Sequence, residues 1–292
     1  MVGPRRQEEL IDQIRADQGS STRRCCRVLG FRRATYHSRK AGRRRPEESD
    51  DVLAKLLRDT ATAEHRLSWG FWKIFHYLRN QDLTTANHKR VYRIWRREGL
   101  HLRQPPRRKR LHREFRDLIS PDGINEGWAM DFVSDWVVGP TKKQVRVINI
   151  MDEGSRRALW TEAHASISAK KLIEVLDQVV EYRGKPLYIR SDNGPEFISN
   201  RLRAWAAAQG IELRFIQPGK PTQNGLIERL NKTLRTECLN LTWFRSMDQL
   251  NEELQAWSQV YNLERPHESI GNLTPDAYET EHQQFYYSVV AA

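Results

Sequence analysis

The sequence is poor in cysteine and has no long apolar run. Its 292 residues include three cysteines, Cys25, Cys26 and Cys238, none in a Cys-x-x-Cys pair or a cysteine–histidine spacing typical of structural zinc. This pattern predicts a reducing compartment and no structural zinc. No stretch approaches the roughly 18 apolar residues that a membrane helix requires, and the N-terminal segment lacks the apolar core of a signal peptide. We therefore expect a cytoplasmic protein without membrane contact.

Negative charge is scarce in the N-terminal two-fifths of the chain. Residues 1–120 hold 30 Lys and Arg against 14 Asp and Glu, a net charge of +16. Residues 121–292 hold 19 against 23, a net charge of −4, so the first part carries the whole excess of the +12 total. Such an asymmetry indicates a polyanionic partner, because each neutralised phosphate releases condensed counterions. We expect a nucleic acid; a generic basic surface is the alternative.

The first region, residues 1–45, is basic and helical by its pattern. Ser21 or Thr22 is expected to cap a short helix that Gly30 ends, and the segment FRRATYHSRK predicts a second helix. Two helices joined by a glycine-containing turn are typical of a helix-turn-helix unit, although many small helix pairs share this pattern.

The second region, residues 46–104, predicts a helix-turn-helix-like DNA-binding domain. It has three segments of helical length with apolar residues at three-to-four spacing, DDVLAKLLRDTA, SWGFWKIFHYLRNQ and TTANHKRVYRIWRREGL. In the last, Val91, Ile94 and Trp95 form the inward face, and we expect the arginines around them to contact phosphates. Aromatic residues here could stack on bases, but their helical spacing favours core packing. We expect core positions for Trp69, Phe71, Trp72 and Phe75.

A basic linker is predicted at residues 105–122. It begins within RQPPRRKR, where the proline pair breaks the helix and the charges favour a solvated segment. We expect this run to follow the DNA backbone, with a simple hinge as the alternative. The basic residues concerned are Arg107, Arg108, Lys109 and Arg110.

The third region, residues 123–281, alternates strands and helices. Its first three strand-like runs are joined by short turns, which favours antiparallel pairing, and its later strands are separated by helices, which favours parallel pairing. One helix is expected from Ser168 to Tyr182, with Gly184 as its stop. The fold class predicted is α/β, with a mixed five-stranded sheet flanked by helices and a C-terminal tail at 282–292.

Three carboxylates stand out in this region. Asp131 lies inside an apolar strand, where burying a carboxylate without a partner is costly. Asp192 follows the strand LYIR, where side chains project into a crevice at the sheet end, although Asp-Asn-Gly also forms turns. Glu228 lies on the polar side of a helix, where an ordinary ion pair with Lys232 would explain it equally well.

The three carboxylates can form one metal site if the strands of Asp131 and Asp192 are adjacent and the helix of Glu228 packs on the sheet. They then converge without a cation, and hard oxygen ligands with open positions suit Mg²⁺. Two such ions, roughly 3.5–4 Å apart, would clamp an in-line displacement at phosphorus. Asp152 also ends an apolar run, but MDEGSRR has the composition of a turn after a strand.

Four segments carry a family resemblance. The order Asp131, Asp192, Glu228, with 35 residues between the last two, resembles the DDE triad of the retroviral integrase superfamily. WAMDFVSD, SDNGPEF, PTQNGLIERLNKTLRTECL and YNLERPHESIGNLTPDAYE are similar to segments of OrfB-type transposases of bacterial insertion sequences. The resemblance covers residues 47–280, and four motifs in order make it highly specific.

The resemblance implies an RNase H-like core that cleaves and joins DNA at the terminal inverted repeats of an insertion sequence. It places Asp131, Asp192 and Glu228 at the catalytic and metal-binding positions, with two Mg²⁺ ions as cofactors and Mn²⁺ as a substitute. The positions implied to contact DNA are Lys232, Arg235, Asn193, Gln223 and Asn224.

The partners implied are double-stranded DNA at the element ends and the target, and further copies of the chain on that DNA. Family members often act with an upstream-frame (OrfA-type) protein that supplies a coiled coil, and this chain has no sustained heptad pattern of its own. Two alternatives follow: the chain is the second frame alone, or it needs such a partner. The protein would act on the bacterial nucleoid. Two other functions stay open: a catalytically silent DNA-binding regulator derived from a transposase, and a nuclease that hydrolyses without joining.

Overall fold

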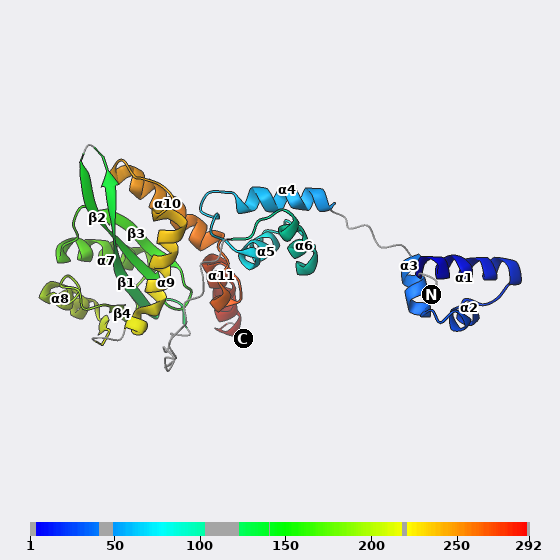
Figure 1. The fold of residues 1–292 in the computed structure, drawn as a ribbon. Helices are drawn as coiled ribbons and strands as arrows, with labels where there is room; N and C mark the ends of the chain where they lie inside the picture. Colours follow the sequence, from blue (N-terminus) through cyan, green and yellow to red (C-terminus); the bar gives the residue numbers. More distant parts are fainter. Residues whose placement is uncertain (1–3, 41–48, 103–122, 140, 218–220, 291–292) are drawn as a thin grey trace. The chain divides into compact units, whose positions relative to one another are not determined.

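The computed structural model describes residues 4–40, 49–102, 123–139, 141–217 and 221–290 (Figure 1). The chain divides into two compact units, residues 1–52 and 53–292. No helix in these described ranges is both long and apolar enough to cross a membrane. The predicted DNA-tracking run of Arg107, Arg108, Lys109 and Arg110 lies outside the described residues.

In the N-terminal unit, residues 4–40 form the helices α1 (Pro4–Gln18), α2 (Thr22–Val28) and α3 (Arg33–Lys40). The side chain of Ser21 caps α2, and Gly30 takes φ +63° just beyond it, as predicted. α1 was not predicted, because most of its side chains are polar and its apolar stripe is short. The three helices share a small core of Ile11, Cys25, Cys26 and Tyr36.

The second region forms the three predicted helices, α4 (Asp50–Ala61), α5 (Phe71–Asn80) and α6 (His88–Arg97). Asn87 caps α6 by accepting a 2.9 Å hydrogen bond from the main-chain N–H of Arg90. The apolar sides of the helices meet in one core. Its largest members are Leu53, Leu57, Trp69, Ile74, Leu78, Val91, Ile94 and Trp95.

One aromatic residue expected in this core lies outside it. Trp69 is 1% exposed and Phe71 and Phe75 pack at the core's edge, whereas Trp72 is 57% exposed. Consecutive helical residues point about 100° apart, so Phe71 and Trp72 cannot both face inward. The ring of Trp72 instead stacks on His76, one turn later, with ring centroids 6.0 Å apart. The prediction of core packing was therefore wrong for Trp72.

A mixed five-stranded sheet, ordered β3-β2-β1-β4-β5, forms the centre of the larger unit. β1 pairs antiparallel with β2, and β2 with β3, while β1–β4 and β4–β5 are parallel. This confirms the predicted sheet. The strands are β1 (Gly127–Val138), β2 (Lys142–Asp152), β3 (Ala158–His164), β4 (Tyr188–Ser191) and β5 (Glu212–Phe215).

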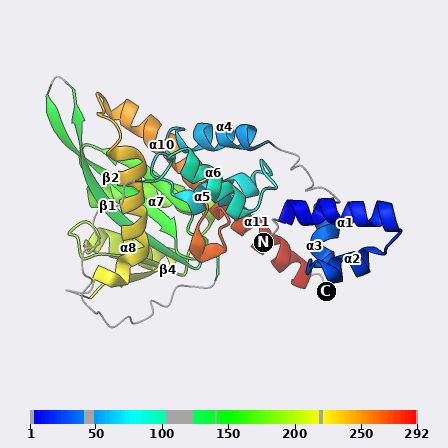
Figure 2. The same ribbon diagram turned by 45° about the vertical axis from the view of Figure 1, so that its right-hand side comes forward.

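Helices cover both faces of this sheet (Figures 1 and 2). Side chains of β1 alternate between the faces, so Trp128 and Met130 pack with α7 and α8, while Ala129 and Val133 pack with α9 and α10. α7 lies where a helix was predicted, with Ser168 as its N-cap and Gly184 at its end. The helices are α7 (Ala169–Arg183), α8 (Asn200–Gln209), α9 (Gly225–Leu234), α10 (Met247–Leu263) and α11 (Pro275–Val290).

α9 runs directly into a π-helical turn, η2 (Arg235–Leu239), which buries Glu237 to 4% exposure. Arg265 Nε donates to both oxygens of the Glu237 carboxylate, at 3.2 and 3.1 Å, and Lys73 Nζ lies 3.8 Å away. Burial, followed by the charge of Arg265, lowers the pKa of Lys73 to about 8. Because Lys73 belongs to α5, Glu237 joins the helix-turn-helix-like helices to the sheet domain.

Substituting Glu237→Gln tests this junction. The change keeps the size of the side chain but leaves the buried Arg265 without its counter-charge, so we expect the free energy of unfolding to fall by about 3 kcal/mol. Urea unfolding measures the loss. The matched control is Glu264→Gln, which breaks the more exposed ion pair with Arg66 and should cost less than about 1 kcal/mol. Equal losses in the two variants would contradict the prediction.

Candidate active site

The three predicted carboxylates come from three elements that the fold brings together. Asp131 lies on β1 and shares the side-chain alternation of Ala129 and Val133, so it is on the face that α9 covers. Asp192 directly follows β4, which pairs in parallel with β1. Glu228 lies in the first turn of α9. The three carboxylates were expected to converge only if the two strands are adjacent and the helix packs on the sheet, and the fold meets both conditions.

α9 is oriented by its apolar stripe. Ile227, Leu230 and Leu234 are at most 1% exposed and pack on the sheet, while Glu228 and Lys232 are exposed on the other side, as predicted. Within the described ranges no ion pair joins Glu228 to Lys232. The simple ion pair considered from the sequence therefore does not account for Glu228.

Electrostatic repulsion links the three carboxylates. Burial raises the pKa of Asp131 to about 6, the charges of Asp192 and Glu228 also raise it, and hydrogen bonds from Phe132 and Asn231 offset part of the rise. No described Lys or Arg forms an ion pair with any of the three carboxylates. A group of acidic side chains without a counter-cation fits a divalent metal ion, which prefers oxygen ligands.

Two asparagines hold Asp131 in place. Asn231 of α9 donates a 2.7 Å hydrogen bond to Asp131 Oδ2, and it accepts one of 2.7 Å from Asn149 Nδ2. Asn149 is fully buried and lies directly opposite Asp131 in the β1–β2 pairing. Sequence reasoning missed Asn149, although an asparagine inside the apolar run VINIM was an available signal.

The residues predicted to contact DNA from α9 and the loop after β4 are exposed. Lys232 and Arg235 are at the surface of α9 and η2, and Arg235 donates a 2.7 Å hydrogen bond to the main-chain oxygen of Ser134. Asn193 is also exposed, and its amide donates to the main-chain oxygen of Ile216 at 2.8 Å.

Gln223 and Asn224 lie at the start of α9 in more enclosed positions. The side chain of Gln223 accepts a 2.8 Å hydrogen bond from the main chain of Gln217, and its main-chain oxygen accepts one from Arg190 at 2.9 Å. Asn224 is 4% exposed, and its Oδ1 has no hydrogen-bond partner among the described residues. Both residues belong to the segment that leads into α9. Contact between these residues and DNA stays a prediction.

Asp152 has a structural role. It is fully buried, and its Oδ1 accepts hydrogen bonds from the main-chain N–H groups of Gly154 and Ser155, at 2.7 and 2.9 Å. It thereby shapes the turn between β2 and β3, as its sequence context predicted.

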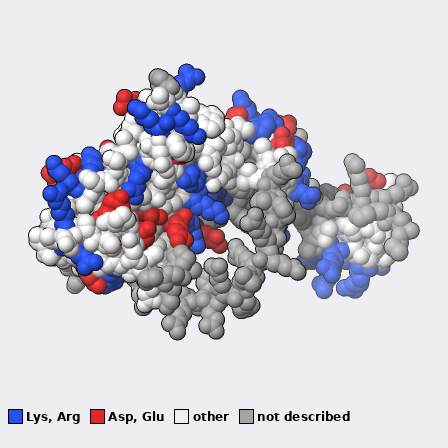
Figure 3. All heavy atoms as spheres, turned by 60° about the vertical axis from the view of Figure 1, so that its left-hand side comes forward, with Lys and Arg blue, Asp and Glu red and all other residues white. Residues whose placement is uncertain are grey.

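The carboxylate oxygens of the candidate active site are not all in close contact with one another. In the described part of the chain, only Glu64, His65 and Glu253 bring three ligand atoms within 4.8 Å of one another, so the ligand atoms of Asp131, Asp192 and Glu228 are spaced more widely. Wider spacing is compatible with two ions roughly 3.5–4 Å apart. Figure 3 shows a patch of acidic side chains with Lys and Arg side chains on either side of it.

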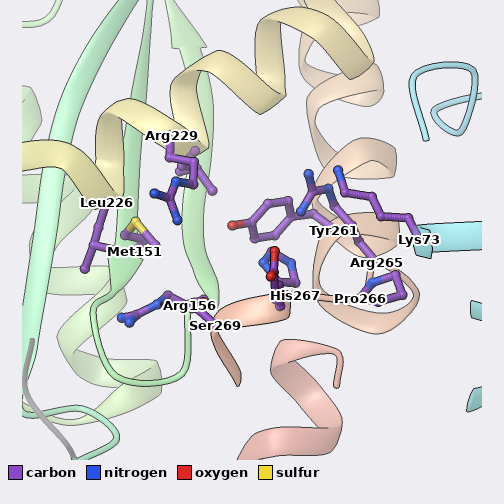
Figure 4. A pocket seen from close by; sticks show the side chains of 12 residues that line it. Lys73, Met151, Arg156, Leu226, Arg229, Tyr261, Arg265, Pro266, His267 and Ser269 are labelled. Carbon is purple, nitrogen blue, oxygen red and sulfur yellow. Dashed lines mark hydrogen bonds between the residues drawn. The ribbon is translucent and has the colours of Figure 1, made fainter. Parts of the chain in front are cut away.

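A separate cavity of about 460 Å³ lies beside α9 (Figure 4). Arg156, Arg229 and Arg265 line it, and none of the three predicted carboxylates does. His267, also in its lining, is 8% exposed and packs edge-on against the ring of Tyr261 at 4.7 Å. Burial lowers the pKa of His267 well below its usual value, so it is neutral and serves the packing.

Comparison with known proteins places these regions in families. Residues 48–110 match the HTH-like domain. Residues 121–221 and 209–275 each match a family described as the integrase core domain. The matches correspond to α4–α6 and to the sheet with its helices.

Relatives in insertion elements extend over nearly the whole chain. An uncharacterized 31.7 kDa protein of insertion element IS407 from Burkholderia multivorans is 35% identical over 273 residues, which are 94% of this chain and 95% of the relative. The chain belongs to the OrfB-type insertion-sequence transposases of the retroviral integrase superfamily. An IS476 protein of Xanthomonas euvesicatoria is 33% identical over 274 residues, 94% of this chain and 77% of that protein. Transposase InsD of IS2 from Escherichia coli is 25% identical over 249 residues, 80% and 81% of the two chains.

Solved integrase structures are also similar to this transposase. The HTLV-2 integrase catalytic core domain in complex with magnesium is 19% identical, with a TM-score of 0.38 over 52% of this chain and 94% of that one. An integrase chain in the simian T-cell lymphotropic virus intasome with the PP2A regulatory subunit B56 gamma is 20% identical, with a TM-score of 0.39 over 72% and 68%.

The raised pKa of Asp131 predicts that this residue destabilises the metal-free transposase. The folded chain holds a proton that the unfolded chain releases between pH 3.8 and about 6, so stability falls as the pH rises through that window. Asp131→Asn removes this loss. In EDTA, we expect the variant to be more stable than the parent at pH 7 by about 1–3 kcal/mol, and equal to it near pH 4.

Chemical unfolding at the two pH values measures the difference. Asp135→Asn is the control, because Asp135 lies on the same strand and, like Asp131, accepts a hydrogen bond from the N–H of the next residue. A variant at position 131 that is less stable than the parent at pH 7 would contradict the prediction that the ionised Asp131 destabilises the fold.

Proposed function

We propose that this transposase binds the terminal inverted repeats of its insertion sequence and cleaves and joins DNA at a site formed by Asp131, Asp192 and Glu228. The observation that supports this most strongly is the convergence of three carboxylates, from β1, from the end of β4 and from α9, with no described counter-cation. Such a site is costly to fold unless a cation enters it, and phosphoryl transfer on DNA is a reaction that uses such cations.

The metal we expect at this site is Mg²⁺, as two ions, with Mn²⁺ as a substitute. Asp131, Asp192 and Glu228 would hold the ions through carboxylate oxygens. When bound, the ions supply Lewis acidity toward the phosphate that reacts and lower the pKa of an attacking water or 3′-hydroxyl. Asn231 contributes by keeping Asp131 in one orientation through its 2.7 Å hydrogen bond.

DNA is expected to approach along the exposed side of α9. Lys232 lies one helical turn beyond Glu228, and Arg235 two turns, so both can bind phosphates that neighbour the reacting one. The helix-turn-helix-like helices add a second basic surface, with Arg93 and Arg96 exposed on α6. Pairing of two element ends calls for further copies of the chain on DNA, and an upstream-frame (OrfA-type) partner is part of the proposal.

Replacing the active-site carboxylates tests the reaction. We expect Asp131→Asn, Asp192→Asn and Glu228→Gln each to lower Mg²⁺-dependent strand transfer by more than about 1,000-fold, because each removes a ligand that the reaction requires. Binding to the terminal repeats, measured by gel shift, should remain. Asp135→Asn, on the same strand as Asp131, should keep both properties.

The outcome separates this proposal from the two other functions. A silent regulator would bind the repeats without any metal-dependent chemistry in the unaltered chain, and a nuclease would release hydrolysed ends without joining them. Strand transfer at the parental rate by any of the three variants would refute the assignment of that residue.

Lys232→Ala tests the path of the DNA. Losing one phosphate contact should weaken binding to all DNA sequences alike and reduce the slope of log K against log salt by about 1. Fluorescence anisotropy at several salt concentrations gives both quantities. Lys170→Ala on α7, whose side chain is 74% exposed, is the control and should leave the slope unchanged. An unchanged slope for Lys232→Ala would place the DNA elsewhere.

A further inference from the structure

A second cluster of metal-ligating side chains lies between the helix-turn-helix-like helices and the sheet domain. Glu64 and His65 belong to the connection between α4 and α5, and Glu253 belongs to α10. One ligand atom from each lies within 4.8 Å of the other two, a proximity that no other such trio of described residues reaches. The proposed reaction uses none of these residues.

His65 has a defined tautomer. Its side chain is 9% exposed, and its Nδ1 lies 3.1 Å from the main-chain oxygen of Glu237. A carbonyl oxygen can only accept a hydrogen bond, so Nδ1 carries a proton and a neutral ring presents a lone pair at Nε2. Metal-ligating histidines commonly have this arrangement, with the outer nitrogen hydrogen bonded to a carbonyl or carboxylate.

The lone pair of His65 Nε2 points toward other acceptors. Nε2 makes no hydrogen bond within the described residues, and the carboxylate of Glu253 is 3.7 Å away. With Glu64 beside it, the cluster contains acceptors alone, so a cation is needed to balance it. A proton on Nε2 would balance the charge of Glu253 alone, whereas a metal ion would bind a ligand atom from each of the three residues.

The backbone at His65 is one of five described non-glycine positions with a positive φ. Its φ is +61°, in the left-handed region that is strained for a residue with a Cβ. Strain of this kind gathers at ligand clamps and active sites, where the surrounding structure holds it. Here it accompanies a buried imidazole beside the carboxylates of the adjacent Glu64 and of Glu253, which comes from α10.

We propose that Glu64, His65 and Glu253 bind one transition-metal ion of the zinc class, which fastens the helix-turn-helix-like region to the RNase H-like core. Imidazole combined with carboxylates suits Zn²⁺ or Co²⁺, whereas Mg²⁺ prefers oxygen ligands alone. Ligand atoms of a tetrahedral zinc site lie about 3.3 Å apart, so modest rotations of the two glutamates complete the site, with water as the fourth ligand. Cysteine spacing predicted no structural zinc, and this set contains no cysteine.

The test uses the full chain with Asp131→Asn and Glu228→Gln already introduced, so that the candidate active site does not bind the probe. Protein freed of metal with a chelator is titrated with Zn²⁺ alone by calorimetry, and Co²⁺ serves as an optical probe of the ligands. We expect one Zn²⁺ per chain, not displaced by excess Mg²⁺. Glu253→Gln should weaken zinc binding at least about 10-fold. The neighbouring, exposed Glu252→Gln should change it less than about twofold.

His65→Asn is the second variant, since asparagine tolerates the left-handed backbone and the chain can remain folded. It should lose zinc binding and the Co²⁺ absorption bands together. Equal zinc affinity in Glu252→Gln and Glu253→Gln overturns the proposal. So does a folded parent that binds no zinc, because His65 and Glu253 would then form an ion pair only. Neither result depends on strand transfer, since the carboxylates of that reaction are already replaced.

Discussion

The packing of α9 on the sheet is the contact on which the rest of this transposase depends. Ile227, Leu230 and Leu234 are buried against β1 and β2, and this fixes the rotation of the helix about its axis. Glu228 and Asn231, which are on one turn of the helix, then lie near Asp131. The π-helical turn at its end buries Glu237 among cations of the helix-turn-helix-like region and the segment after α10. A single apolar stripe thus positions both the candidate active site and the junction between domains.

The carboxylates of Glu237, on η2, and of Asp131, beside α9, differ in their counter-charges. Around Glu237, the protein supplies its own cations, Arg265 and Lys73, and the result is a structural junction. Around Asp131, no described cation is supplied, and burial, together with the like charges of Asp192 and Glu228, raises the pKa of its carboxyl. An unbalanced site destabilises the folded chain by itself, which is typical of a site arranged for a bound ion and a reaction.

Local elements and the positions of the three carboxylates could be predicted from the sequence. Helix ends such as Ser21 and Gly184 depend on neighbouring residues, and Asp131 stands out because a mid-strand carboxylate conflicts with its apolar surroundings. Trp72 was predicted wrongly, because helical spacing shows that a face is apolar but not where that face ends. The order of the family motifs linked Asp131, Asp192 and Glu228 before any geometry was known.

The sequence by itself indicated the helices and strands other than α1, the mixed sheet and the family, because periodicity, connection lengths and short motifs each depend on residues close in the chain. Only the tertiary structure showed that Asn149 and Asn231 hold Asp131, and that Glu228 is not paired with Lys232. It also brought His65 to Glu253, 188 residues away in numbering, a contact that no spacing rule anticipates. These contacts form between side chains far apart in sequence, and their distances depend on how α9 and α10 pack on the sheet.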